Sequence, residues 1–128
     1  MRAGAAAYSD LKALWHLEEM QKLTQHKRFA PPHVQLILSD LCNQDCHFCA
    51  YRMSNGFSAE NFGENGNRNP NRKIPTDKAL EILNDCASVG VKAIQFTGGG
   101  EPTVHPDHLT IFAHALGLGF RCALVTNG

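Results

Sequence analysis

Three cysteines on one short segment are the residues of this sequence whose types and spacing could do chemistry. Cys42, Cys46 and Cys49 form a Cys-x3-Cys-x2-Cys triplet directly after the apolar run 34–38. Thiolates are the usual ligands of iron–sulfur clusters, and a [4Fe-4S] cluster has four irons. Three thiolates could therefore hold three irons and leave the fourth open to a group that does not come from the protein.

A zinc site is one alternative for the triplet, with His47, Cys86 or Cys122 as an additional ligand, and a loop of unrelated buried thiols is another. Cys86 lies ten positions beyond Thr76, on a predicted helix that leads away from the cysteine loop. Cys122 lies five residues before Asn127 on a predicted strand. The rise per residue of a helix and of a strand puts both thiols roughly 15 Å from the loop. We expect both to be small core hydrophobes, and His47 to face solvent or to contact a ligand residue.

A glycine-rich segment, Gly98-Gly99-Gly100-Glu101-Pro102, follows a second apolar run. Glycines without a Cβ let a polar group approach the backbone amides and carbonyls closely. A tight turn without a ligand is the alternative. A phosphate-binding loop is less favoured, because no Gly-Lys-Ser/Thr sequence follows.

The elements that must position these segments are short apolar strands that alternate with helices. Strands are predicted over 34–39, 91–97 and 120–126. Thr76 is expected to cap a helix that ends at Gly90, and Asp107 to cap a second helix. The expected apolar positions are Leu80, Ile82, Leu83, Cys86 and Val89 in the first helix and Leu109, Phe112, Ala113 and Leu116 in the second. This order predicts an α/β fold, a βαβαβ unit whose strands are parallel and whose following loops meet at one edge.

Two further segments flank this unit or interrupt it. Ser9 or Asp10 can cap a helix that runs to about Lys27 before Pro31-Pro32, so residues 1–30 are predicted to be a helical lead-in that covers an end or edge of the sheet, and residues 31–128 the main domain. The Asn/Gly-rich segment 50–75 is several-fold longer than a usual α/β connection. It is either a tolerated surface insertion or a lid or docking loop, in which the residues of interest are Tyr51, Arg52, Phe57 and Phe62.

Composition excludes several classes of function. The 128 residues are 43% hydrophobic and 19% charged, which is ordinary for a globular domain. Basic and acidic residues number 12 each, so no net charge attracts the chain to nucleic acid or to anionic lipid. The start has no signal-peptide core and no membrane span is evident. Five cysteines, an odd number, favour metal binding in the reducing cytoplasm over a disulfide framework.

The motifs together resemble a known family. Cys42-Asn-Gln-Asp-Cys46-His-Phe-Cys49 after the first predicted strand, Phe96-Thr-Gly-Gly-Gly-Glu-Pro102 after the second and Thr126-Asn-Gly128 after the third resemble the N-terminal half of the radical S-adenosylmethionine (radical SAM) core domain. The resemblance spans 34–128 and implies the first portion of a partial TIM-type (β/α) barrel. A complete barrel takes about 250 residues, so the chain is expected to be a fragment of a longer protein.

The resemblance also implies cofactors and site residues. Cys42, Cys46 and Cys49 would bind three irons of a [4Fe-4S] cluster, and the fourth iron would take the amino and carboxylate groups of S-adenosylmethionine. Gly99, Gly100 and Glu101 match the segment that receives the methionine amino group. The backbone around Phe48 matches a region that touches the adenine, and Asn127 falls where the third strand faces the cofactor.

The implied activity is that of a radical SAM enzyme. A reduced cluster would cleave S-adenosylmethionine to methionine and a 5′-deoxyadenosyl radical, which abstracts hydrogen from an unidentified substrate. A flavodoxin or a ferredoxin is the implied electron donor. An iron–sulfur module for electron transfer or redox sensing, without radical chemistry, is the alternative from another class.

Overall fold

The computed structural model of the protein describes residues 14, 16–44, 46–49 and 73–128, which fall in two compact units, Met1–Pro31 and Pro32–Gly128. The four residues of interest in segment 50–75, and the predicted helix caps Ser9 and Asp10, lie outside the described residues. In the first unit, α1 spans Leu17–Thr24 and buries no residue. It ends before Lys27, contrary to the prediction, because His26 adopts a left-handed backbone (φ 54°). That α1 covers the sheet stays a prediction.

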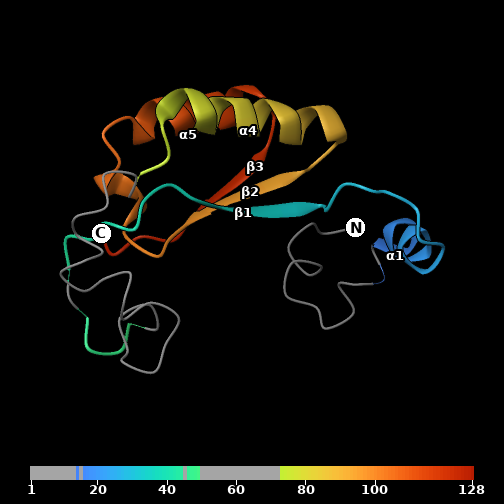
Figure 1. Ribbon diagram of the computed structural model, residues 1–128, viewed down its shortest axis with the longest axis horizontal. Helices are drawn as coiled ribbons and strands as arrows, with labels where there is room; N and C mark the ends of the chain where they lie inside the picture. Colours follow the sequence, from blue (N-terminus) through green and yellow to red (C-terminus); the bar gives the residue numbers. More distant parts are fainter. Residues whose placement is uncertain (1–13, 15, 45, 50–72) are drawn as a thin grey trace, which may run out of the picture. The chain divides into compact units, whose positions relative to one another are not determined.

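The second unit is built on a three-stranded parallel sheet (Figure 1). Its strands β1 (His33–Ile37), β2 (Ala93–Thr97) and β3 (Arg121–Leu124) are ordered β1-β2-β3. β2 pairs in parallel with both neighbours, with Ile37 opposite Thr97 and Phe96 opposite Leu124. The α/β class and the βαβαβ order are therefore confirmed.

Two helices cover one face of this sheet. Helices α4 (Thr76–Val89) and α5 (His108–Gly117) lie side by side, and the short 3₁₀ helix η2 (Pro102–Val104) precedes α5 (Figure 1). Between helices and sheet the largest fully buried side chains are those of Leu38, Leu83, Ile94, Phe96, Pro102 and Ile111. The rings of Phe96 and Phe112 have centroids 4.5 Å apart. This core holds the carboxyl ends of the strands in register.

The strand bounds differ from the predicted ones: β1 begins one residue early and ends at Ile37, β2 begins late at Ala93 but ends as predicted, and β3 is shorter at both ends. The Pro32 carbonyl accepts hydrogen bonds from the N–H groups of both Lys92 and Ala93, so regular pairing begins at Ala93 rather than at residue 91. At the other end Ser39 leaves the β1 ladder, because its carbonyl accepts from Gly100 N and its hydroxyl accepts from Leu41 N. These bonds turn the chain into the loop that carries the cysteines.

The predicted side-chain caps of both helices are wrong. Pro75, with an extended ψ of 142°, occupies the N-cap position of α4 and its carbonyl accepts from Ala79 N, so Thr76 is already helical. Asp107 is the N-cap residue of α5 but makes no side-chain cap bond. Its carboxylate instead accepts a 2.5 Å hydrogen bond from the Thr76 hydroxyl, which joins the starts of the two helices. The predicted end of α4 is confirmed, with Gly90 in the left-handed region at φ 92°.

Several predicted core positions of the helices are exposed. Val89 in α4 and Leu109 and Leu116 in α5 are each more than 60% exposed. The buried positions are Ala79 and Leu83 in α4 and Ile111 and Ala115 in α5. The buried positions are four apart in each helix, so Leu109 and Leu116 in α5 and Val89 at the end of α4 lie off the covered faces. Across the described part of the chain, no helix is long and apolar enough to cross a membrane.

Candidate functional site

Three loops meet at the carboxyl edge of the sheet. Because the strands are parallel and in register, the segments after Ile37, Thr97 and Leu124 leave from the same edge. They carry the cysteine triplet, the glycine run with Glu101, and the Thr-Asn-Gly segment respectively. The structure thus brings together the loops that the sequence singled out.

The cysteine loop presents three half-buried free thiols. Cys49 N donates to Cys46 O at 3.0 Å, a turn that brings the second and third cysteines of the triplet together in the backbone. The Cys46 sulfur lies 3.6 Å from Gln44 Oε1. The Cys42 sulfur lies 3.9 Å from Asn43 Oδ1. Among the described residues, no three Cys, His, Asp or Glu side chains are placed to hold one metal ion.

The aromatic neighbours of the triplet lie at the surface. Phe48 is 73% exposed, and its only described ring contact is an edge-on one with His47, at 5.1 Å between centroids. His47 is itself exposed, in agreement with the expectation that it faces solvent. Both side chains are open to a ligand but neither is fixed by the protein core.

The glycine run packs against the start of the cysteine loop. Gly100 N donates to Ser39 O at 3.0 Å and Glu101 N donates to Leu41 O at 2.8 Å. A Cβ at Gly100 would overlap the Leu41 carbonyl oxygen and the backbone of Asp40. Gly100 therefore allows the backbones of two loops to approach each other closely, whereas the sequence had predicted the close approach of a ligand.

The Glu101 carboxylate is turned inward and is 3% exposed. Its Oε1 accepts from Thr103 N at 3.0 Å and from the hydroxyls of Thr103 and Thr126, both at 2.8 Å. Its Oε2 accepts from Asn127 N at 2.8 Å. Burial raises the pKa of this carboxyl, but the four hydrogen bonds outweigh burial and hold the pKa below its ordinary value. Glu101 is thus a buried anion that ties the loop after β2 to the loop after β3.

Asn127 connects this carboxylate to the cysteine loop. Its side-chain Nδ2 lies 3.5 Å from the Cys42 sulfur and donates to Asn43 Oδ1 at 2.9 Å. The backbone of Asn127 thus contacts the loop after β2, and its side chain contacts the cysteine loop. The prediction placed Asn127 beside a cofactor, and the structure places it beside a predicted cluster ligand.

Sequence reasoning missed three residues that support the site. Thr103 and Thr126 donate hydrogen bonds to the Glu101 carboxylate, as described above. His105 is 2% exposed, its Nδ1 accepts from Asp107 N at 3.1 Å and its Nε2 lies 2.8 Å from Ile74 O. Because Nδ1 is an acceptor, Nε2 carries the proton and donates to Ile74 O. Ile74 N in turn donates to Leu38 O, so His105 anchors the segment where the chain returns to the sheet.

The two remaining cysteines lie away from the three loops. Cys86 is in the last turn of α4, which runs back toward the amino ends of the strands, and Cys122 is opposite Ile94 near the start of β3. The expectation that both belong to the core is wrong: Cys86 is half-buried and Cys122 is exposed. All four residues of β3, an edge of the described sheet, are exposed. Burial, with a smaller effect of Asp85, raises the pKa of the Cys86 thiol.

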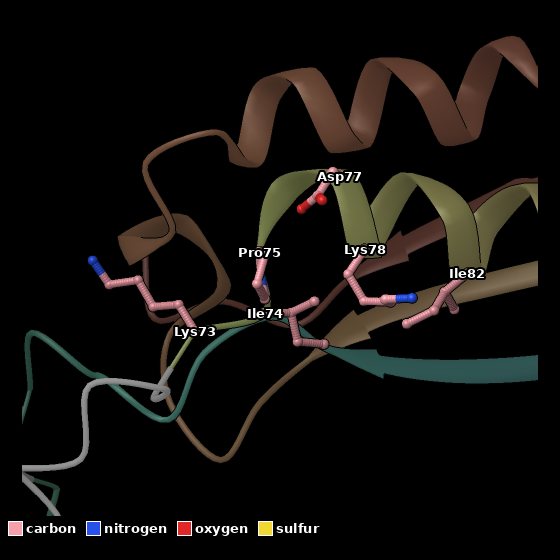
Figure 2. Close-up of a pocket in the computed structure, with 6 residues that line it drawn as sticks. All are labelled: Lys73, Ile74, Pro75, Asp77, Lys78 and Ile82. Atoms are coloured by element: carbon pink, nitrogen blue, oxygen red, sulfur yellow. The ribbon is translucent and has the colours of Figure 1, made fainter.

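An open groove lies at the start of α4, beside the segment that follows β1. It is lined by Lys73, Ile74, Pro75, Asp77, Lys78 and Ile82 (Figure 2). The side chains of Lys73 and Lys78 extend in different directions in Figure 2. The described residues that line the groove include no cysteine or histidine, so we assign the chemistry of the site to the loops.

Comparison with known proteins decides what kind of site this is. The model of the radical SAM superfamily matches residues 36–128, which include all three loops. The chain belongs to the radical SAM superfamily. Enzymes of this superfamily use a [4Fe-4S] cluster together with S-adenosylmethionine.

The radical SAM chain is similar to several curated enzymes. It is 30% identical over 99 residues to the AdoMet-dependent heme synthase of Methanosarcina barkeri, which is 77% of this chain and 25% of that enzyme. It is 28% identical over 109 residues to the PqqA peptide cyclase of Bradyrhizobium diazoefficiens, 85% of this chain and 25% of the relative. A GTP 3′,8-cyclase of Clostridium perfringens is 33% identical over 73 residues, 56% of this chain and 19% of the relative. The chain therefore spans about a quarter or less of the relatives it matches.

The donor set of this radical SAM chain fits a four-iron cluster with one open iron. Three free thiols share one loop and no disulfide links them, while Cys86 lies in the last turn of α4 and Cys122 near the start of β3. Thiolates are the ligands that such clusters require. The described residues of the loop include no fourth cysteine.

Proposed function

We propose that this chain forms the cluster-binding part of a radical SAM enzyme, with Cys42, Cys46 and Cys49 each holding one iron of a [4Fe-4S] cluster. The observation that carries the proposal is the meeting of the three loops at one edge, where hydrogen bonds from Asn127 reach both Cys42 and Glu101. When bound, the cluster supplies one electron that cleaves S-adenosylmethionine to methionine and a 5′-deoxyadenosyl radical, which takes hydrogen from a substrate.

The glycine run is proposed to border the methionine amino group. The Glu101 carboxylate already accepts four hydrogen bonds, two from Thr103 in the loop after β2 and two from Thr126 and Asn127 in the loop after β3. We therefore assign the contact with the amino group to the backbone of Gly99 and Gly100. Glu101 contributes by holding that backbone beside the cysteine loop, through the bond from its N–H to Leu41 O.

Phe48 is proposed to contribute to the adenine contact through the backbone around it. Its ring is 73% exposed, so it can be covered by the nucleoside without displacing any part of the core. Asn127 is proposed to face the cofactor from the loop after β3, where its side chain already lies beside Cys42.

We propose that residues 31–128 are the first portion of a partial TIM-type barrel and that residues 1–30 are a lead-in to it. A flavodoxin or ferredoxin type of protein is proposed as the electron donor. Crowded free thiols suit a reducing compartment, so the cytoplasm is the proposed location. The similar relatives are named for three different reactions, and the proposal is limited to the radical step.

Anaerobic reconstitution with iron and sulfide tests the cysteine assignment. The wild-type protein should bind about four irons per chain and absorb in the visible region, whereas alanine at Cys42, Cys46 or Cys49 should abolish the cluster. Cys86→Ala and Cys122→Ala are matched controls and should retain it. With dithionite and S-adenosylmethionine, the loaded protein should form 5′-deoxyadenosine. A colourless protein that contains zinc, or cluster loss in the control variants, would overturn the assignment.

A further inference from the structure

The side-chain amide of Asn127 has two acceptors within reach. Its Nδ2 lies 3.5 Å from Cys42 Sγ and 2.9 Å from Asn43 Oδ1. A primary amide nitrogen carries two hydrogens, so one nitrogen can donate to both groups at once. Both partners are acceptors when Cys42 is a thiolate, which fixes the orientation of the amide with nitrogen toward the cysteine loop.

Hydrogen bonds to the Glu101 carboxylate hold the backbone of Asn127 in place. The Asn127 N–H donates to Glu101 Oε2 at 2.8 Å, and the hydroxyl of the preceding Thr126 donates to Glu101 Oε1 at 2.8 Å. Glu101 is 3% exposed, and its own N–H is bonded to Leu41 O, one residue before Cys42. The Glu101 carboxylate therefore holds the backbone of the donor residue, and the Glu101 N–H holds the backbone next to Cys42.

We propose that Asn127 is a positioning residue that donates an N–H···S hydrogen bond to Cys42 and makes the cluster easier to reduce. This inference rests on the proposed function, since it requires Cys42 to be a cluster ligand. Hydrogen bonds to cluster sulfurs stabilise the reduced state, which carries one more negative charge, and so raise the reduction potential. Groups that contact metal ligands tune metal sites in this way.

This role differs from a direct contact between Asn127 and S-adenosylmethionine. A contact with S-adenosylmethionine acts only when that molecule is present. An N–H···S hydrogen bond acts on the cluster alone. The two roles can therefore be separated by a measurement without S-adenosylmethionine.

The test is a redox titration of the reconstituted protein without S-adenosylmethionine, followed by electron paramagnetic resonance of the reduced cluster. Asn127→Ala, and Asn127→Leu as a variant of similar size without a donor, should both shift the midpoint potential to more negative values. Asn84→Ala is the control, because Asn84 is an exposed asparagine on α4 whose amide oxygen contacts His114. It should leave the midpoint potential unchanged.

Three results would overturn the inference. Equal midpoint potentials in wild type and both Asn127 variants would show that the amide does not act on the cluster. Equal potentials together with weaker binding of S-adenosylmethionine would assign Asn127 to that molecule instead. A wild-type protein that binds no four-iron cluster would remove the proposed cluster site itself, and the inference with it, so the two failures are distinguishable.

Discussion

The backbone N–H of Asn127 donates a 2.8 Å hydrogen bond to Oε2 of Glu101 and so joins the loop after β3 to the loop after β2. The same carboxylate accepts three further hydrogen bonds from Thr103 and Thr126. In this structure the Glu101 carboxylate therefore links the two loops. Several consequences of this arrangement can be measured.

Replacing the buried carboxylate with an amide should destabilise the second unit. Glu101→Gln puts an NH₂ group where one oxygen accepts hydrogen bonds, so at least one donor of Thr103, Thr126 or Asn127 loses its partner. We expect the free energy of unfolding in urea to fall by about 1–3 kcal/mol. Glu81→Gln is the control, because Glu81 is exposed and pairs only with Lys78 on the helix surface; little change is expected there. Equal losses in both variants would contradict the role of Glu101.

Acid should remove the contribution of Glu101. The pKa of Glu101 in the folded protein lies below its ordinary value of 4.5, so in acid the unfolded chain takes up the proton first. Its stabilising effect is complete above that ordinary value and is lost as the pH falls through the lower pKa of the folded state. The unfolding free energy of the wild type should therefore decrease below about pH 4.5 more steeply than that of Glu101→Gln. Parallel pH profiles would contradict this prediction.

A side chain at Gly100 should separate the loops after β1 and β2. The Cβ of Gly100→Ala would overlap the Leu41 carbonyl oxygen, and overpacking of this kind costs about 1–3 kcal/mol. Gly117→Ala is a matched control at the end of α5, where a Cβ has no atom within 4 Å. Alanine is the better helix former, so this change should be neutral or stabilising by up to about 1 kcal/mol. Urea unfolding measures both, and a neutral Gly100→Ala would refute the close approach.

The buried imidazole of His105 should matter more than an exposed one. His105→Ala leaves the carbonyl of Ile74 and the N–H of Asp107 without their part-buried hydrogen bonds, and we expect the unfolding free energy to fall by about 1–3 kcal/mol. His114→Ala removes only an exposed contact with Asn84 and should change the unfolding free energy by about 0.5 kcal/mol or less. The amide of Ile74 should also exchange its hydrogen faster in His105→Ala. Unchanged exchange would show that His105 does not anchor this segment.

Local patterns predicted the elements and the order of the loops. Apolar runs bounded by polar residues located all three strands, and Gly90 correctly ended α4. The cysteine spacing and the glycine run were visible because their members are close in sequence. These features depend on neighbouring residues, which is the information that a single sequence carries best.

Features that depend on distant residues were not predictable. Thr76 bonds to Asp107, 31 positions away, so neither side chain acts as the expected cap. The inward orientation of Glu101 depends on Thr126 and Asn127, about 25 positions later. The exposure of Cys122 follows from the edge position of β3, which no local pattern specifies.

The proposed function requires that a cluster held by Cys42, Cys46 and Cys49 has one iron open to S-adenosylmethionine. Its most direct test is the electron paramagnetic resonance spectrum of the reduced, reconstituted protein, recorded with and without S-adenosylmethionine. We expect a four-iron signal whose g values shift when S-adenosylmethionine is added. A four-iron signal that stays the same at saturating S-adenosylmethionine would contradict it and favour an electron-transfer module.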